Sequence, residues 1–579
     1  MKLNYKKTIL VGFAFFLISA FWQAYDSIVP MMLVNKFGLS QSLSGIIMSI
    51  DNVIAVFLLP LFGSLSDRTN TKFGRRTPYI VVGTVIAVVT FFGLSFADNL
   101  QLAKIGAEGG ESFYEQVFDG NYEIANAEYS TFNKTSAPEK YTVKDYASKV
   151  VKNKAYSDLT EDEQNEVKSW YKSINAQYLK DHTSPETVYA CVDGVYKTVE
   201  VEDGKYYYYN GTEKVEIKKV DTRNAYTNLV TPAISKYAWE KTLSNPTPLV
   251  LFMLLLLVTL LSMAIFRSPA VALMPDVTVK PLRSQANAII NLMGTAGGML
   301  VLVLGIVFGT GKAYNQHMSY TVFIGAVCLV MVIGLVAFIL TVKEKSWAEE
   351  MREESVRLGI EENKNENQGQ SEERKLSKPE FKSLILLLAS VALWFIAYNA
   401  VTSKYSLYAT NVLHMDYNTT LLLAQGAAII SYVPVGMVAR KFGRKKCILS
   451  GITMLTVAFF GATFMTANSS VILVDVLFVL AGIGWATINV NSFPMVVELA
   501  SGSNVGKYTG YYYTASMSAQ ILTPILSGLI MDLVGNMRPL FYYATVFAAI
   551  AFITMIFVKH GDSKPIAKKT VLESLDVED

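Results

Sequence analysis

Long apolar runs and short polar loops alternate along most of this chain of 579 residues. A run of about 20 apolar residues is long enough to cross the hydrocarbon core of a bilayer as a helix. Such runs predict membrane helices at about 8–33, 44–65, 79–97, 249–273, 286–308, 322–342, 382–404, 421–438, 447–465, 471–496, 509–533 and 540–558. We therefore expect an all-α membrane protein with 12 transmembrane helices.

Polar segments interrupt this pattern and define the predicted organisation. An insert after the third helix is rich in tyrosine, with amphipathic segments at 144–152 and 161–171 and strand-like alternation between 187 and 217, which predicts a small α+β unit. An insert of this length is either functional or decorative. The expected division is helices 1–3 (1–97), insert (98–246), helices 4–6 (247–342), linker (343–380), helices 7–12 (381–558) and tail (559–579). The linker is dense in Lys and Glu and cannot bury enough apolar surface to fold alone.

The loop between the second and third helices is short and strongly basic, and it indicates the topology. It spans 63–78 and carries Arg68, Arg75 and Arg76. Short loops rich in Lys and Arg stay on the cytoplasmic side of a membrane. We therefore expect a multi-pass protein of the cell membrane with both termini in the cytoplasm and the insert outside. A shortened copy of the loop at 436–446 predicts an internal repeat of two halves, which is typical of transporters with a site between the halves.

Charge and cysteine content exclude several other classes. The net charge of +3 gives no indication of a nucleic-acid partner. Cys191, Cys328 and Cys447 lack the spacing of a metal site or a disulfide framework. The apolar run at 9–33 is too long for the core of a signal peptide. Because the chain has no phosphate-binding loop, we expect no enzyme, no cofactor and no resident metal, and an ion gradient as the source of energy.

The basic loop also carries a family resemblance. Its run Gly63-Ser-Leu-Ser-Asp67-Arg68, followed by Gly74-Arg75-Arg76, resembles the loop between helices 2 and 3 of major facilitator transporters. The version at 73–80 is most similar to that of the sucrose-proton symporters and solute carrier family 45, within the glycoside-pentoside-hexuronide cation symporter group. This resemblance implies a major facilitator fold of two six-helix halves that rock around a central site.

A second stretch extends the resemblance to the junction of helices 4 and 5. The run from Arg267 to Asp276, followed by Arg283-Ser-Gln-Ala-Asn287, is similar to that of the sucrose-type symporters. In the melibiose-type branch, carboxylates on helix 2 bind sodium. The equivalent positions here are Ala55 and Leu59, and this departure favours protons over sodium.

Asp26, Asp51 and Arg267 are the ionisable residues that stand out within the predicted membrane helices, where a charge is costly and usually functional. Helix 1 runs outward and helix 4 inward, and side chains lean toward the N-terminus of their helix, so Asp26 and Arg267 can meet across a cavity. Our hypothesis is that Asp26 carries a coupling proton and Arg267 is its charge partner, a pair that the resemblance also implies. Alternatively, Asp26 caps the outer end of helix 1 at the interface. Asp51 is either a second proton site or a polar contact.

A cytoplasmic gate is predicted from the charges next to the two basic loops. Asp276 and Arg283 are interpreted as a salt bridge that closes it, and the others would join the halves through charged hydrogen bonds to acidic partners such as Glu498. The predicted gate residues are Asp67, Arg68, Arg75, Arg76, Asp276, Arg283, Arg444 and Glu498.

A sugar is neutral and rich in hydroxyl groups, so its site needs aromatic platforms and amide groups. Core packing or interfacial anchoring is the alternative for each of these side chains. The predicted substrate contacts are Trp22, Gln23, Tyr25, Asn287, Asn291, Trp394, Tyr398, Asn399, Trp485, Asn489, Asn491 and Gln520.

Together these features predict a secondary transporter that couples protons to the symport of a disaccharide or glycoside, such as sucrose or maltose. A carrier for a non-sugar solute is one alternative, because fold does not fix substrate. A membrane sensor that binds its ligand through the insert is another. We expect the partners to be a small sugar, H⁺ and the lipid bilayer, and the protein to be a monomer.

Overall fold

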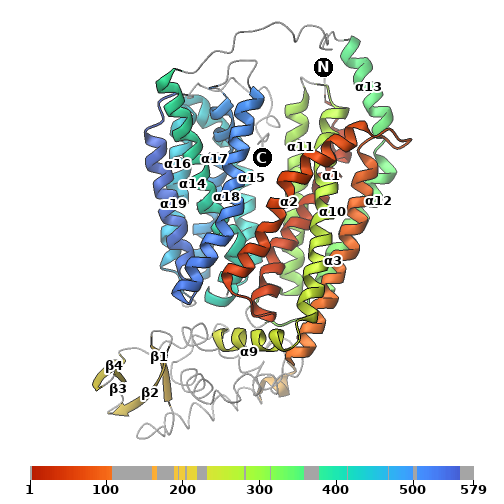
Figure 1. Cartoon of the computed structure of the whole chain (residues 1–579). Coiled ribbons are helices and arrows are strands. Elements are labelled where there is room, and N and C mark those ends of the chain that lie inside the picture. The colour runs from red at the N-terminus through yellow and green to blue at the C-terminus, as the bar shows by residue number, and fades with distance from the viewer. Residues whose placement is uncertain are drawn as a thin grey trace.

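The computed structural model contains two bundles of long helices and a small sheet beyond one end of them (Figure 1). It describes residues 3–106, 159–165, 188–192, 195–202, 205–210, 212–217, 231–279, 282–312, 315–357, 377–413, 415–466, 469–497, 499 and 505–560. Among these residues, eleven helices are long and apolar enough to cross a membrane. We call the end that carries the sheet the insert end, and the opposite end, with the basic loop, the loop end.

The N-terminal half supplies one bundle. Its helices are α1 (Tyr5–Met31, continued by a π-helical turn at Met32–Lys36), α2 (Gln41–Arg68), α3 (Thr77–Ile105), α10 (Thr247–Val277), α11 (Arg283–Phe308) and α12 (Thr321–Thr341). The C-terminal half supplies the other, with α14 (Lys378–Tyr408, continued by a π-helical turn at Ala409–Leu413), α15 (Tyr417–Phe442), α16 (Arg444–Thr463), α17 (Val471–Val497), α18 (Val505–Val534) and α19 (Pro539–Ile556). Each half has its own cluster of buried apolar side chains.

The internal repeat predicted from the two basic loops is confirmed by how the helices pack. In the first half α1 packs on α11 and α12, and α3 packs on α10; in the second half α14 packs on α18 and α19, and α16 packs on α17. The first helix of each half ends in a π-helical turn. Contacts between the halves follow the same symmetry, since α2 packs on α18 and α11 packs on α15.

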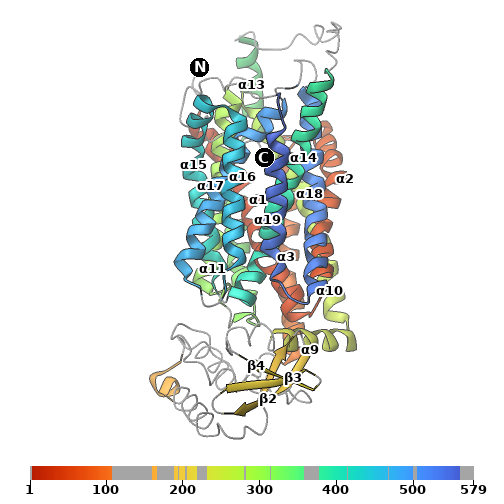
Figure 2. The ribbon, with the colours of Figure 1, turned by 90° about the vertical axis from the view of Figure 1, so that its left-hand side faces the viewer.

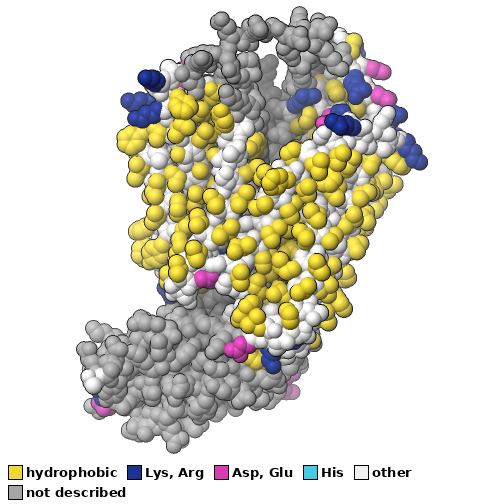
Figure 3. Space-filling view, viewed as in Figure 1, with side chains coloured by type: hydrophobic (Ala, Val, Ile, Leu, Met, Phe, Trp, Pro, Cys, Tyr) yellow, Lys and Arg dark blue, Asp and Glu magenta, His cyan; other side chains and the backbone are white. Residues whose placement is uncertain are grey.

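The surface of the bundles fits a lipid environment. Apolar side chains cover the visible flanks of both bundles, and Lys and Arg side chains gather at the loop end (Figure 3). Local signals set the helix ends: the side chain of Ser40 accepts a hydrogen bond from the backbone of Leu43 at the start of α2, and Ser377 and Glu380 form a capping box at the start of α14. Gly106, with φ of 73°, ends α3 in the left-handed region.

Helix α15 lies where the eighth helix was predicted. It extends beyond the predicted 421–438 at both ends, to Tyr417 and Phe442. With 26 residues it is long enough to cross a bilayer, and the predicted count of 12 membrane helices includes it.

The insert contains the strands that the alternating pattern predicts. Strands β1 (Val188–Val192), β2 (Val195–Glu202), β3 (Lys205–Asn210) and β4 (Glu213–Ile217) form an antiparallel sheet in the order β1-β2-β3-β4. Figure 2 shows this sheet and α9 (Thr231–Ser244) beyond the insert end. Of the predicted amphipathic segments, 161–165 is helical, whereas 144–152 and 166–171 lie outside the described residues.

Helix α3 continues to Ile105, past its predicted end at residue 97. The residue that suggested an exit from the membrane, Asp98, is fully buried and pairs with Lys36, whose Nζ lies 2.6 Å from Asp98 Oδ2. The ammonium group also donates to the carbonyl of Met318 at 2.8 Å and lies 3.9 Å from the ring centre of Tyr320. Because Lys36 neutralises the charge of Asp98, this residue fits inside the helix, and α3 continues past it to Ile105.

Residues 344–357 of the predicted linker form helix α13 (Glu344–Arg357). This helix does not fold alone, because it packs against α10 and buries Trp347. Composition predicted correctly that the segment lacks a core of its own. It did not reveal that the N-terminal half provides one.

Candidate functional site

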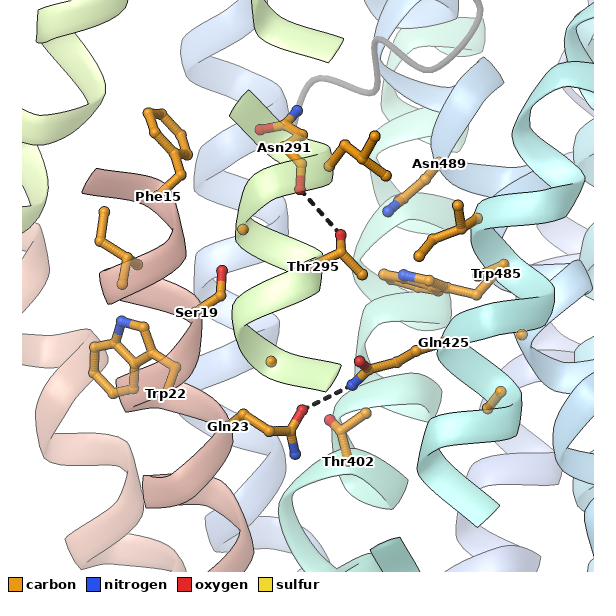
Figure 4. A pocket seen from close by; sticks show the side chains of 18 of the residues that line it. Phe15, Ser19, Trp22, Gln23, Asn291, Thr295, Thr402, Gln425, Trp485 and Asn489 are labelled. Atoms are coloured by element: carbon orange, nitrogen blue, oxygen red, sulfur yellow. Dashed lines mark hydrogen bonds between the residues drawn. The ribbon is translucent and has the colours of Figure 1, made fainter. Parts of the chain in front are cut away.

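A cavity of about 950 Å³ lies between the two halves. Its walls come from α1, α10 and α11 on one side and from α14, α15, α16, α17 and α18 on the other. Figure 4 shows polar and aromatic side chains from both halves that point into this space. Cavities of about 300–1,000 Å³ with a few polar groups among apolar walls are typical ligand sites.

The wall from the N-terminal half carries the charges. Asp26 lines the cavity and its side chain is exposed there. Arg267 also lines it, with its guanidinium carbon 6.0 Å from the ring centre of Trp22. Asp51 lies behind this wall, where its charge interacts with those of both Arg267 and Asp26. Asp26 and Arg267 do not form a direct ion pair among the described residues.

The wall from the C-terminal half has a different chemistry, being aromatic and amide-rich. The rings of Tyr398 and Trp485 stack in parallel, 3.6 Å apart between centres and 4° between planes. Asn489 lies one turn from Trp485 on α17 and also faces the cavity. Gln425 on α15 reaches across the cavity, and its Nε2 donates to Oε1 of Gln23 on α1 at 2.7 Å. An extended flat ring surface beside neutral hydrogen-bonding groups is suited to a polar ligand with an apolar face.

The cavity brings together most of the side chains that the sequence suggested. The predicted residues that line it are Trp22, Gln23, Asp26, Arg267, Arg283, Asn287, Asn291, Tyr398, Trp485 and Asn489. Trp22 also has a buried indole N–H with no hydrogen-bond partner among the described residues.

Other predicted contacts lie outside the lining, and for three of them the packing gives the reason. Trp394 is fully buried in the core of the second half, and Tyr25 packs against Phe21 and Trp22. Asn491 donates to the carbonyl of Thr487 at 2.9 Å within its own helix. Asn399, Gln520 and Asp51 likewise do not line the cavity.

Sequence reasoning missed several polar residues of the lining. They are Ser19, Ser27, Thr295, Thr402, Ser406, Gln425 and Tyr432. One signal was available for Gln425, because it is an amide within the otherwise apolar run of helix α15. A polar side chain in a membrane helix usually faces protein or water rather than lipid.

The predicted gate residues of the basic loop form a charged cluster at the loop end. Arg75 Nε donates to Asp276 Oδ2 at 3.0 Å, and Arg76 Nε donates to the same oxygen at 2.8 Å. Arg76 also pairs with Asp67 and bonds to Ser66. Burial opposes the charge on Arg76, but its hydrogen bonds and ion pairs with Asp276 and Asp67 outweigh that effect and raise its pKa. All of these groups belong to the N-terminal half.

The expected salt bridge between Asp276 and Arg283 is not formed. Arg283 instead donates to the carbonyl of Pro275 at 2.9 Å and to that of Thr278 at 3.2 Å, because Asp276 is already engaged by the two loop arginines. Arg68 is exposed in the last turn of α2, and Arg444 begins α16. Glu498, the predicted partner from the other half, lies outside the described residues.

Glu344, the first residue of α13, is a further member of the cluster. Its carboxylate accepts from the backbone N–H groups of Arg75 at 2.7 Å, Arg76 at 2.8 Å and Thr77 at 2.7 Å, and from the Thr77 hydroxyl at 2.7 Å. These are the free donors at the start of α3, where negative charge is favoured. Gly74, with φ of 115°, brings the loop so close that a Cβ there would lie 2.3 Å from this carboxyl group.

Comparison with known proteins agrees with this architecture. The family model described as Major Facilitator Superfamily matches residues 233–489 and 421–575, and the one described as MFS/sugar transport protein matches residues 10–107. The xylose transporter XylE of E. coli, in an inward open conformation, has a similar fold, with a TM-score of 0.53 at 12% identity over 98% of this chain and 99% of that one.

Two curated relatives match over short stretches. The chain is 30% identical over 138 residues to the MFS-type transporter ppzB of Metarhizium rileyi, which is 24% of this chain and 28% of that protein. It is 30% identical over 80 residues to the "Putative glycoside/cation symporter YagG" of Escherichia coli, which is 13% of this chain and 17% of that protein. These matches span less than a third of either relative. The family models and the fold together cover both halves, and the chain belongs to the Major Facilitator Superfamily.

Proposed function

We propose that this protein is a secondary transporter that carries a neutral sugar or glycoside together with a proton by alternating access. The observation that carries the proposal is the cavity between the halves, which has a charged wall with one exposed carboxylate and an opposite wall of stacked rings and amides. A family match to sugar transport proteins over 10–107 and a relative named as a glycoside/cation symporter agree with a sugar.

The proposed topology counts α15 as a twelfth span. With 26 residues it is long enough to cross a bilayer. Its side chains Gln425 and Tyr432 line the cavity. The basic loops and both termini would then be cytoplasmic in the cell membrane, with the insert outside, as the charge bias predicts. We propose that the monomer is the transporting unit, because both walls of the cavity come from one chain.

The proposed substrate contacts are the aromatic and amide groups of the lining. The face of Trp485 is extended by Tyr398 and offers a platform for the apolar face of a sugar ring. Trp22, on the facing wall, offers a second aromatic surface. Amides on both walls can accept from and donate to hydroxyl groups. Asn287, Asn291 and Asn489 line the part of the cavity on the loop-end side of this platform.

The proposed proton site is Asp26. Two carboxylates, Asp26 and Asp51, face one guanidinium, Arg267, which leaves one net negative charge in an apolar bundle. Uncompensated charge inside a membrane protein is costly, and one proton removes it. Asp26 is the carboxylate that lines the cavity, so it is the one that a proton from the aqueous side reaches first.

The test is uptake of radiolabelled sucrose and maltose into vesicles with an imposed pH gradient. Asp26→Asn is expected to abolish accumulation driven by the gradient and to leave exchange of labelled for unlabelled sugar partly intact, because the neutral side chain mimics the protonated state. Glu349→Gln, an exposed carboxylate on α13, serves as the control and should accumulate sugar normally. Normal accumulation by Asp26→Asn would remove Asp26 from the mechanism.

Deletion of part of the insert distinguishes a carrier from a sensor. The structure sets the boundaries, since α3 continues to Ile105 and α9 is bonded into the bundle, with Gln101 Nε2 donating to Thr242 Oγ1 at 2.8 Å. Replacement of 108–230 by a short Gly-Ser linker should therefore spare the fold. A carrier retains uptake in this variant. Loss of uptake, with normal membrane levels and thermal stability, would favour a ligand-binding role of the insert.

A further inference from the structure

One hydrogen bond crosses the cavity directly from one half to the other. Gln425 Nε2 on α15 donates to Gln23 Oε1 on α1 at 2.7 Å, and both side chains line the cavity (Figure 4). The bond lies on the side of the cavity nearer the insert end, because Gln425 is two turns into a helix that begins there. A ligand that enters from the loop end reaches this bond at the closed end of its path.

The bond is connected to the closed insert end through further polar groups. Gln23 Nε2 donates to Ser27 Oγ at 3.2 Å, and Ser27 lies near Tyr417, the first residue of α15. The Tyr417 hydroxyl lies 3.0 Å from Thr310 Oγ1, which also accepts from Asn418 Nδ2 at 3.1 Å. These contacts join α1 and the end of α11 to the start of α15. A change at Gln23 therefore reaches contacts that hold the two halves together.

We propose that the Gln23–Gln425 bond is the contact that the substrate replaces, and that its replacement releases the insert end. The proposal rests on the proposed function and narrows it to substrates with adjacent hydroxyl groups. The two amides present an acceptor and a donor 2.7 Å apart. Loss of the bond frees the Gln425 Nε2 donor and the Gln23 Oε1 acceptor. Two neighbouring hydroxyl groups can accept from the first and donate to the second. A carboxylate only accepts and an ammonium group only donates, so each would satisfy only one of these two atoms.

The energies suit such a switch. A neutral amide hydrogen bond contributes only modestly, because each partner is satisfied by water or by a ligand once the bond breaks. A ligand shifts a conformational equilibrium only by its differential affinity for the two states. A sugar seated between Gln23 and Gln425 restores the lost hydrogen bonds in the opened state. The empty carrier has to open without that compensation.

The experiment measures opening of the insert end in purified protein in nanodiscs. The reporter is Ser49→Cys, in a background with Cys191, Cys328 and Cys447 replaced by serine. Ser49 is 2% exposed, and its hydroxyl bonds to the carbonyl of Ile521 across the halves, so a maleimide reaches this position only when α2 and α18 separate. The labelling rate is compared for Gln23→Leu, Gln425→Leu, the double variant and Thr295→Val. Thr295 also lines the cavity but bonds only within its helix, to Asn291 at 3.0 Å.

Without sugar, each glutamine variant is expected to label about three- to tenfold faster than the control, and the double variant no faster than either single one, because all remove the same bond. Saturating sucrose or maltose is expected to speed labelling of the parent and to have little further effect on the glutamine variants. Labelling of both single variants at the rate of Thr295→Val, or additive effects in the double variant, would overturn the proposal.

The labelling measurements with added sugar distinguish a failure of this inference from a failure of the proposed function. If the sugars are taken up by the parent but the glutamine variants label and respond as it does, the bond has no switching role and the transport function stands. If the variants label faster while no sugar affects the parent, the bond holds the insert end closed and the assignment of a hydroxyl-rich substrate is wrong.

Discussion

The two ends of the molecule use polar contacts in opposite ways. At the insert end they join the halves: Asp532 of α18 accepts from the backbone N–H groups of Gln41 at 2.9 Å and Ser42 at 2.8 Å, and Lys404 of α14 donates to the carbonyl of Gln41 at 2.8 Å. At the loop end the charged groups Arg75, Arg76, Asp276 and Glu344 are satisfied within the N-terminal half and α13.

This difference shows how the two halves can separate at one end with only a modest loss of free energy. A buried charge that loses its partner destabilises a protein by several kcal/mol. At the loop end, separation of the halves leaves Arg75 and Arg76 paired, because their carboxylate partner Asp276 lies on the same half. At the insert end the contacts between halves are mostly neutral or involve backbone groups, which water can satisfy. Closure at either end then depends on modest and reversible contacts.

The largest loss of stability is expected from removal of the Lys36–Asp98 pair, which lies inside the N-terminal half at the insert end. Asp98→Asn removes the charge partner of a fully buried ammonium group and should destabilise the protein by about 3–5 kcal/mol. Thermal unfolding in detergent measures this loss. Glu350→Gln is the matched control, since it removes the partner of Lys7 in a pair whose side chains are 33% and 55% exposed, and it should change stability by less than about 1 kcal/mol.

A double variant sharpens this prediction. Lys36→Met combined with Asp98→Leu removes both charges, and it should recover most of the stability lost in Asp98→Asn, because the cost arises from an unpaired buried charge rather than from the missing bond. Equal losses for Asp98→Asn and Glu350→Gln would show that burial does not distinguish the two pairs.

A smaller effect is expected at the loop end from Glu344→Ala. The change leaves the backbone N–H groups of Arg75, Arg76 and Thr77 without their acceptor and should cost about 1–2 kcal/mol, the upper part of the range for loss of a helix N-cap. It should also release α13, which limited proteolysis within 344–357 detects. Glu349→Ala, on the exposed face of the same helix, should unfold and be cleaved as the parent does.

The sequence predicted the fold well because membrane helices are set by length and hydropathy, which are local properties. The sheet of the insert was equally accessible from its alternating pattern. The side chains that face the cavity were harder to predict, as Asn489 and Asn491 show. They are two residues apart on α17, yet the first lines the cavity and the second bonds back to Thr487.

The reason lies in the rotation of membrane helices about their axes. The core and the lipid are both apolar, so the two faces of such a helix look alike and hydropathy does not fix its rotation. Ion pairs between residues far apart in the sequence could not be predicted from local pattern either. Asp98 was therefore interpreted as the start of a loop, although Lys36 neutralises it in the core. The sequence signals that did mark the site were polar and aromatic residues close together on one helix, such as Trp485 and Asn489 of α17.

The smallest of these effects is expected at the seal between the halves, from Asp532→Ala. Asp532 is exposed and caps the N-terminus of α2 from the opposite half. Its loss should therefore destabilise the state with a closed insert end by about 1 kcal/mol. That corresponds to roughly fivefold faster labelling of a cysteine at Ser49. Asp532→Asn retains an acceptor and should give an intermediate rate. Thermal stability should be almost unchanged in both, because neither half loses a contact of its own core. If Asp532→Ala lowered stability as Asp98→Asn does while the labelling rate stayed the same, Asp532 would belong to the folding core of one half rather than to the contact between them.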